Sequence, residues 1–276
     1  MWPKANSPGA LTSSKTHSSR WRRYSSASIA GVSKYGWGKR FMAPRPYVKV
    51  SGCANQKRGL VAVIIAENLV KSFGDTRALG PVTFSIPAGS HIALTGRSGS
   101  GKSTLLSLLG CLDTPTSGRL EIAGINTAGL GDAALSQIRL RQIGFIHQFF
   151  DLVSDLTAFE NVMVPFWLAG EPLGEPKASE LLKKLGLAHR LNHLTGDLSG
   201  GEQQRVAVAR AVALGPKIIL ADEPTGSLDS RTGAAVMDLI IETATALGAT
   251  LIVATHSPEV TARLPGKLTL LDGALC

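Results

Sequence analysis

The nine residues from Gly96 to Thr104, Gly-Arg-Ser-Gly-Ser-Gly-Lys-Ser-Thr, constrain the fold of this 276-residue chain more than any other stretch. They match the phosphate-binding pattern G-x-x-x-x-G-K-[ST] at every fixed position. An apolar run of strand length, residues 91–95, comes before the loop, and a Leu-rich segment without proline, residues 103–112, follows it as a helix would. A strand, a glycine loop and a helix in this order predict a site for a nucleoside triphosphate.

Each residue type in this loop suits the binding of phosphate. The glycines let successive backbone N–H groups point at one anion, Lys102 brings a positive charge to the outer phosphates, and the Ser103 hydroxyl can bind Mg²⁺. A Gly/Ser-rich linker could match the pattern by accident, but the correct flanking strand and helix make that interpretation the weaker one. The expected nucleotide contacts are Gly96, Arg97, Ser98, Gly99, Ser100, Gly101, Lys102, Ser103 and Thr104.

Charge is distributed unevenly along the chain, whose formal net charge is +9. Residues 1–66 contain 12 Lys and Arg but no Asp or Glu, which leaves 17 basic and 20 acidic residues for the rest, a net charge of −3. The basic excess therefore belongs to the N-terminal tail. Because the remainder is mildly acidic, we expect no nucleic-acid partner.

The tail itself, residues 1–60, is rich in Ser, Gly, Arg and Lys and shows no hydrophobic periodicity, which predicts disorder. Its composition is typical of an organellar transit peptide, but upstream sequence translated from a misassigned start site would look the same, and both interpretations stay open. No apolar run in the chain approaches the roughly 18 to 20 residues that cross a bilayer, so we expect no transmembrane helix.

Two further apolar runs end in residues suited to phosphate chemistry. Residues 218–221 are followed at once by Asp222 and Glu223, which places two carboxylates at the carboxyl end of a buried strand, where α/β sheets hold their ligands. Asp222 can hold Mg²⁺, and Glu223 can accept a proton from an attacking water. The second run, residues 251–254, leads to His256. A lone histidine is more often structural, although one at such a strand end is placed to reach the γ-phosphate.

The rest of the pattern predicts further strands and a helical insertion. From residue 149 to residue 196 the apolar spacing is helical, divided by three prolines, and indicates an inserted helical lobe. Residues 237–247 are expected to form a crossover helix. Phe73 could stack on a nucleobase, but a lone Phe is more often a core residue. Strands are expected over residues 61–66, 82–86, 119–124 and 143–147.

A second phosphate-binding element is predicted by the string Leu198-Ser-Gly-Gly-Glu-Gln-Gln-Arg205. Ser199 and the two glycines open a helix expected over residues 202–214, so the serine can cap the helix and its N-terminus can bind an anion. One chain with one nucleotide has no obvious use for a second site of this kind.

With this string the chain, from about Val61 to its end, resembles the ATP-binding cassette (ABC) family, whose signature motif it is. The resemblance implies that ATP and Mg²⁺ are the cofactors, and that two cassettes pair head to tail, as a homodimer or a pair of different cassettes. Each ATP would lie between one subunit's P-loop and the other's signature. The implied fold is α/β, a P-loop NTPase (RecA-like) core with a mostly parallel sheet. The implied ATPase domain spans residues 61–276. It also contains an N-terminal antiparallel β-subdomain and an inserted α-helical subdomain over about residues 149–206.

The resemblance also implies a role for each matching residue. Lys102, Gln148, Glu223 and His256 would take part in catalysis, with Glu223 as the base and His256 as the switch histidine. Phe73 would be the adenine platform, where the family often has Tyr. The metal ligands would be Ser103, Gln148 and Asp222, and the contacts to the partner's ATP would be Ser199, Gly200, Gly201 and Glu202.

Three shorter stretches, residues 112–118, 156–162 and 186–193, look like the bacterial clade that includes lipoprotein-releasing and macrolide-exporting cassettes. This implies an ATPase subunit lying peripherally on the cytoplasmic side of the inner membrane, beneath a separate permease, or in an organelle if residues 1–60 are a transit peptide. The alternative is a non-transport ABC ATPase acting on a cell-envelope or nucleic-acid machine. The long coiled coil of repair-type cassettes and the second cassette of translation-type proteins are both missing from the sequence.

Overall fold

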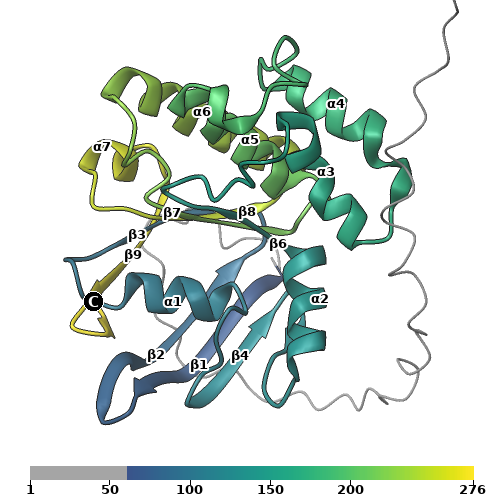
Figure 1. Ribbon diagram of the computed structural model, residues 1–276. Coiled ribbons are helices and arrows are strands. Elements are labelled where there is room, and N and C mark those ends of the chain that lie inside the picture. Colours follow the sequence, from purple (N-terminus) through teal and green to yellow (C-terminus); the bar gives the residue numbers. More distant parts are fainter. Residues whose placement is uncertain (1–60) are drawn as a thin grey trace, which may run out of the picture. The chain divides into compact units, whose positions relative to one another are not determined.

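A computed structural model describes residues 61–276, and Figure 1 shows their arrangement. The disordered tail expected for residues 1–60 lies outside the described residues. No helix within residues 61–276 combines the length and the apolar character that a membrane span requires.

The first sheet is antiparallel and has the strand order β2-β1-β4-β5. Strands β1 (Ala62–Phe73) and β2 (Thr76–Pro87) form a hairpin whose turn is the Gly74-Asp75 pair, and β4 (Ser117–Ile122) and β5 (Ile125–Asn126) complete the sheet. The hairpin strands are longer than predicted because they pair with each other as far as Phe73 and Thr76, beyond the buried residues that make a strand visible in sequence.

The second sheet has the order β10-β9-β3-β8-β7-β6, and all its neighbouring strands are parallel except β10 and β9. Leu94 pairs with Ala254, Ala254 with Asp222, and Ile146 with Ala221, so four strands end at one edge. The strands are β3 (His91–Thr95), β6 (Ile143–Ile146), β7 (Ile218–Asp222), β8 (Thr250–Ala254), β9 (Gly266–Leu271) and β10 (Ala274–Leu275).

Helices cover both faces of this parallel sheet. On one face, α1 (Lys102–Leu109) packs its leucines into a core shared with the antiparallel sheet, and α2 (Asp132–Gln142) borders it. The other face is covered by the remaining helices (Figure 1), and their apolar side chains form a second core with it. The strands supply both cores by alternation, since Ile218 and Leu220 join the first while Ile219 and Ala221 join the second. The helices of the second face are α3 (Ala158–Leu168), α4 (Glu175–Lys184), α5 (Gly200–Val212), α6 (Ser230–Leu247) and α7 (Pro258–Ala262).

Several helix boundaries differ from the predicted ones. Pro165 lies inside α3 and does not divide the lobe there, because a proline removes one backbone hydrogen bond while Val162 and Phe166 keep the helix packed in the core. Helix α6 begins seven residues before the predicted start, where the Asp229 carboxylate accepts from the N–H groups of Arg231 and Thr232. Helix α2 has little apolar periodicity and was not predicted.

Gly144 marks a close approach of β6 to α5. A Cβ atom built at this residue would lie 2.3 Å from the Ala211 carbonyl oxygen. Gly144→Ala should therefore lower the free energy of unfolding by about 1–3 kcal/mol, because the strand or the helix must shift. Urea unfolding followed by circular dichroism measures it. The control is Gly196→Ala, where a built Cβ meets nothing within 4 Å and the change should stay within about 0.5 kcal/mol. Equal effects of the two changes would contradict the close approach.

Candidate nucleotide-binding site

The residues predicted for catalysis leave the ends of four neighbouring parallel strands. The P-loop follows β3, Gln148 follows β6, Asp222 and Glu223 end β7, and His256 follows β8. Because β3 lies beside β8, β8 beside β7, and β7 beside β6, the structure brings all four segments to one edge of the sheet. This edge is where open α/β sheets bind their ligands.

The P-loop is a tight turn in which two glycines are required. Gly96 has φ 155° and a Cβ there would lie 2.4 Å from the Leu270 carbonyl oxygen, while Gly101 has φ 95° and a Cβ there would lie 2.7 Å from that of Ala78. Gly101 caps α1 without any side-chain hydrogen bond, so no side chain occupies the first N–H groups of this helix. They are available to an anion. Of the other predicted contacts, Arg97, Ser98, Gly99 and Ser103 are exposed, Thr104 is half-buried and Ser100 is buried.

Lys102 lies across the loop that it follows. Its ammonium donates to the carbonyl oxygens of Gly96, at 2.9 Å, and of Arg97, at 3.0 Å. The positive charge is therefore held beside the turn whose uncapped N–H groups are available to an anion, which is where the outer phosphates of a nucleotide are expected.

Ser103 and Asp222, two of the predicted metal ligands, are in contact. The Ser103 hydroxyl donates to Asp222 Oδ2 at 3.3 Å, although the two residues are 119 positions apart. Burial raises the pKa of Asp222, and the neighbouring Glu223 carboxylate adds to the increase, while the Ser103 hydrogen bond opposes it. A cation here would relieve the cost of that buried charge. The hydroxyl and carboxylate oxygens of Ser103 and Asp222 are the kind of ligand that Mg²⁺ takes, together with phosphate and water.

Glu223 is fixed at its carboxylate and strained at its backbone. Its φ is 46°, unusual for a residue with a side chain, and its N–H donates to the Ala254 carbonyl oxygen at 2.9 Å. One carboxylate oxygen accepts from the His256 N–H at 3.0 Å and lies 2.6 Å from His256 Nδ1, and the other accepts from the Thr255 hydroxyl at 3.3 Å. The end of β8 thus orients the predicted base. The His256 side chain, 78% exposed, extends from it into solvent.

Gln148 reaches the same edge from β6. The Gln148 carbonyl oxygen accepts from the Ser227 hydroxyl at 2.9 Å, and a Cβ built on Gly226 would lie 2.9 Å from Gln148 Nε2. The Gly226 N–H donates to the Glu223 carbonyl oxygen at 3.0 Å. The predicted metal ligand therefore packs on the turn that immediately follows the predicted base.

Phe73 lies at the tip of the first hairpin, with 55% of its surface exposed. It is not the core residue that its type alone favours. The Lys71 ammonium lies 4.8 Å from the centroid of the ring, and the Asp113 carboxylate holds that ammonium at 2.6 Å. The exposed ring is compatible with a platform for a base.

The signature segment forms a complete capping box at the start of α5. The Ser199 hydroxyl accepts from the Glu202 N–H, and Glu202 Oε2 accepts from the Ser199 N–H at 2.9 Å. The Arg190 guanidinium, which the sequence did not single out, donates to Glu202 Oε1 at 2.9 Å. In the described part of the chain, no hydrogen bond joins this segment to the P-loop, and a Cβ on Gly201 would meet Thr232 of α6.

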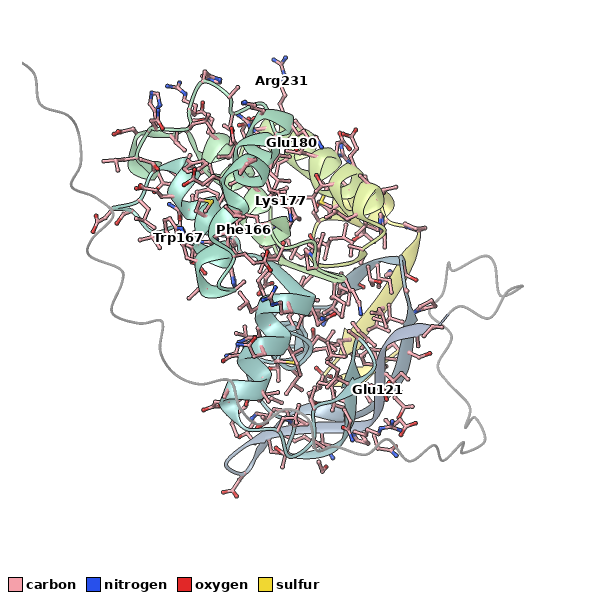
Figure 2. The ribbon with its side chains drawn as sticks, turned by 90° about the vertical axis from the view of Figure 1, so that its right-hand side faces the viewer. Glu121, Phe166, Trp167, Lys177, Glu180 and Arg231 are labelled. Atoms are coloured by element: carbon pink, nitrogen blue, oxygen red, sulfur yellow. The ribbon has the colours of Figure 1, made fainter. Side chains whose placement is uncertain are left out.

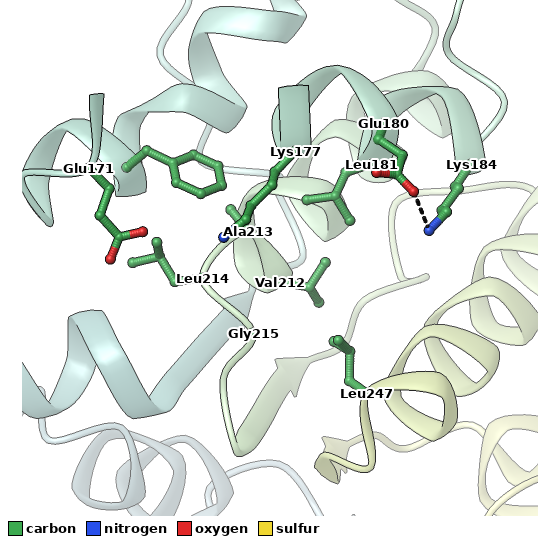
Figure 3. A pocket seen from close by; sticks show the side chains of 11 residues that line it. Glu171, Lys177, Glu180, Leu181, Lys184, Val212, Ala213, Leu214, Gly215 and Leu247 are labelled. Carbon is green, nitrogen blue, oxygen red and sulfur yellow. Dashed lines mark ion pairs between the residues drawn. The ribbon is translucent and has the colours of Figure 1, made fainter. Parts of the chain in front are cut away.

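A separate hollow of about 290 Å³ lies between α4 and the ends of α5 and α6 (Figure 3). Its floor is apolar, with Phe166 and Val212, and its rim carries Lys177 and the Glu180–Lys184 ion pair. It contains none of the predicted site residues.

Because of the capping box, we expect the free energy of unfolding to depend on pH in the acidic range. The Ser199 N–H and, less strongly, Arg190 lower the pKa of Glu202 from 4.5 to about 2. Since the folded pKa is the lower one, the stabilisation is complete above pH 4.5 and is lost as pH falls towards 2. Glu202→Gln should therefore cost most stability at pH 7 and progressively less between about pH 5 and pH 2. Urea unfolding across this range measures the difference between the two proteins, and a constant difference would contradict the assignment.

Comparisons with known proteins identify the family of the chain. The sequence profile described as ABC transporter matches residues 79–226. The chain is 44% identical over 211 residues to the lipoprotein-releasing system ATP-binding protein LolD of Shewanella oneidensis, a match covering 74% of this chain and 92% of that protein. It is 47% identical over 204 residues to the macrolide export ATP-binding/permease protein MacB of Bradyrhizobium diazoefficiens, covering 72% of this chain and 31% of that protein.

Among solved structures, the dimeric post-hydrolysis state of the ATP-binding cassette MJ0796 bound to ADP and Pi matches with a TM-score of 0.68 and 40% identity, covering 77% of this chain and 96% of that one. The α/β fold expected from the sequence is confirmed. The chain belongs to the ABC transporter family, and it is an ATP-binding cassette and ATPase of that family.

Proposed function

We propose that this ATPase is the energy-supplying subunit of an ABC transporter, working with a separate membrane permease in lipoprotein release or export. The proposal rests on one observation above all. The chain has a complete P-loop edge and, apart from it, a second Ser-Gly-Gly helix start that no hydrogen bond in the described residues ties to that edge. The names of the LolD and MacB relatives support the transport role.

In the proposed mechanism the P-loop holds the phosphates of ATP and Lys102 turns from its carbonyl partners to the outer phosphates. Ser103, Asp222 and Gln148 would hold Mg²⁺, which neutralises charge on the transferred phosphoryl group. Glu223, oriented by Thr255 and His256, accepts the proton of the attacking water. His256 reaches the γ-phosphate from the end of β8, and Phe73 stacks on adenine.

The second helix start serves the ATP of a paired cassette in this proposal. Ser199, Gly200, Gly201 and Glu202 present the N-terminus of α5, and the similar cassette MJ0796 is a dimer in its post-hydrolysis state. A homodimer or a pair of different cassettes would satisfy the arrangement equally. We further propose that residues 61–276 form one ATPase domain with a helical subdomain over about residues 149–206.

The permease would dock in a groove of about 580 Å³ between α2, β6, the end of α3 and α5. Leu168, 70% exposed, lines it, and Phe149, 73% exposed, follows the lining residue His147 by two positions. Trp167 is half exposed beside the buried Phe166 on α3 (Figure 2). Phe150, Leu152 and Leu156, which follow Phe149 in the chain, are partly buried. In this proposal the protein lies peripherally on the cytoplasmic face of the inner membrane, or in an organelle if residues 1–60 are a transit peptide.

The pairing of cassettes is tested with Glu223→Gln, which keeps the shape of the side chain but cannot accept the proton of the water. ATP bound between two chains should then persist, so the variant should be a dimer with ATP and Mg²⁺ and a monomer without them. Size-exclusion chromatography with light scattering measures the mass.

Adding Ser199→Arg should abolish that dimer, because a bulky cation fills the space for the partner's nucleotide, while ATP binding to the same chain's P-loop remains. A Glu223→Gln protein that stays monomeric at saturating ATP would contradict head-to-tail pairing of the isolated subunit.

The docking groove is tested by co-purification of the tagged protein with its permease from detergent-solubilised membranes. Phe149→Ser combined with Leu168→Ser should reduce the recovered permease at least about tenfold, because apolar contact area is lost. Basal ATPase activity should not change. Leu271→Ser, at an exposed apolar residue (48%) that lies on β9, is the control. Undiminished recovery with the double variant would exclude this groove.

A further inference from the structure

The segment from His147 to Asp151 connects the ATP site to the proposed docking groove, and side chains hold its backbone. Gln148 packs at Gly226 near the base, while His147 and Asp151 line the groove. The backbone is not that of a regular turn, since Phe150 has φ 66° and Asp151 has φ 48°, both unusual for residues with a side chain. Something outside the segment must stabilise this conformation.

Two side chains of α5 supply much of that support. The Arg210 guanidinium donates from Nη1 to the Asp151 carbonyl oxygen at 2.7 Å and from Nη2 to the Phe150 carbonyl oxygen at 3.0 Å. Gln204 donates from Nε2 to the carbonyl oxygen of His147 at 3.3 Å and to that of Pro224, the residue after the base, at 2.7 Å. Ser227 adds the bond to the Gln148 carbonyl oxygen.

These side-chain bonds take the place of the backbone hydrogen bonds that a helix or a strand would provide. The carbonyl oxygens of Gln148, Phe150 and Asp151 each accept from a side chain, and the described residues provide them with no backbone donor. Gln204 is completely buried, and a buried amide that bonds two loops at once fixes the distance between them. Arg210 also lines the groove, so one guanidinium contacts both the proposed partner surface and the loop behind it.

We infer that Arg210 and Gln204 are positioning residues, which hold the backbone of residues 147–151 so that Gln148 lies at the Glu223–Gly226 turn. Arg210 acts from the groove side and Gln204 from the side of the base. A partner seated in the groove would therefore reach Gln148 through Arg210. The inference builds on the proposed catalytic role of Gln148 and adds the residues that give this glutamine its place.

Hydrogen exchange of the full-length protein tests whether Arg210 stabilises the backbone of residues 147–151. Arg210→Met removes both donors and keeps the length of the side chain, so the amides of residues 149–153 should exchange at least about tenfold faster, while those of α5 and the parallel sheet stay protected. Arg210→Lys, which reaches one carbonyl oxygen at a time, should lie between. Arg263→Met is the matched control, because Arg263 also bonds a backbone carbonyl, that of Ala234, on another part of the chain.

A kinetic double-mutant cycle tests whether Arg210 acts through Gln148. Arg210→Met should lower the ATPase kcat about tenfold in the otherwise unchanged protein but less than about twofold when Gln148→Ala is already present. A merely structural role would lower the melting temperature and reduce kcat equally in both backgrounds. Gln204→Met, which lacks the donor but keeps the volume, should show the same dependence on Gln148.

Three results would overturn the inference: unchanged exchange of residues 149–153 in Arg210→Met, a rise spread over the whole domain, or additive losses of kcat. If Gln148→Ala alone leaves kcat unchanged, the proposed role of Gln148 is wrong, and with it the placement of this glutamine for catalysis. The exchange of residues 149–153 is measured without turnover, so it separates that failure from a failure of Arg210 to hold the loop.

Discussion

A parallel sheet that is buried on both faces leaves only the ends of its strands for chemistry. Residues 218–221 of β7 alternate between two different cores, which leaves Asp222 as the residue of this strand that can reach a ligand. The groups proposed for catalysis, apart from this carboxylate, lie just beyond the ends of the paired strands, where the ladder no longer satisfies peptide groups. The side chains of Gln204, Arg210 and Ser227 satisfy them for the loop after β6. The positions of the loops at this edge of the sheet therefore depend on hydrogen bonds from side chains to the backbone.

The N-termini of the helices are of two kinds, those capped by side chains and those left uncapped. Thr157 with Glu160 and Ser199 with Glu202 form reciprocal capping boxes at α3 and α5, and Asp229 caps α6. Helix α1 alone follows a tight glycine turn and has neither a capping side chain nor an acidic residue in its first turn, a combination that none of the other described α-helices has. Self-capped helices can form before any ligand arrives, whereas α1 keeps its N–H groups for an external anion.

The sequence predicted the features that depend on neighbours in the chain. The P-loop, β3 and β8 were found within a residue, because glycine spacing and runs of buried residues are local signals. The threonine and glutamate of the α3 capping box have the spacing of a recognisable motif and were not used. Other features depend on distant contacts: Ser227 and Gln148 are 79 positions apart, and Gln204 and His147 are 57 apart. No local pattern could pair them, nor show that Pro165 stays inside α3. The exposure of Phe73 depends on where the hairpin ends.

Lys102 adds a consequence for selectivity. Its ammonium is already satisfied by two carbonyl oxygens, which carry partial charges. A ligand that recruits it must offer better acceptors than these, and phosphate oxygens with full negative charge do so, since charge-assisted bonds are about twice as strong as neutral ones. A nucleoside without phosphates offers no such exchange. The loop therefore favours ligands that carry a strongly negative phosphate tail. It discriminates between ligands by this charge, independently of how the base is recognised.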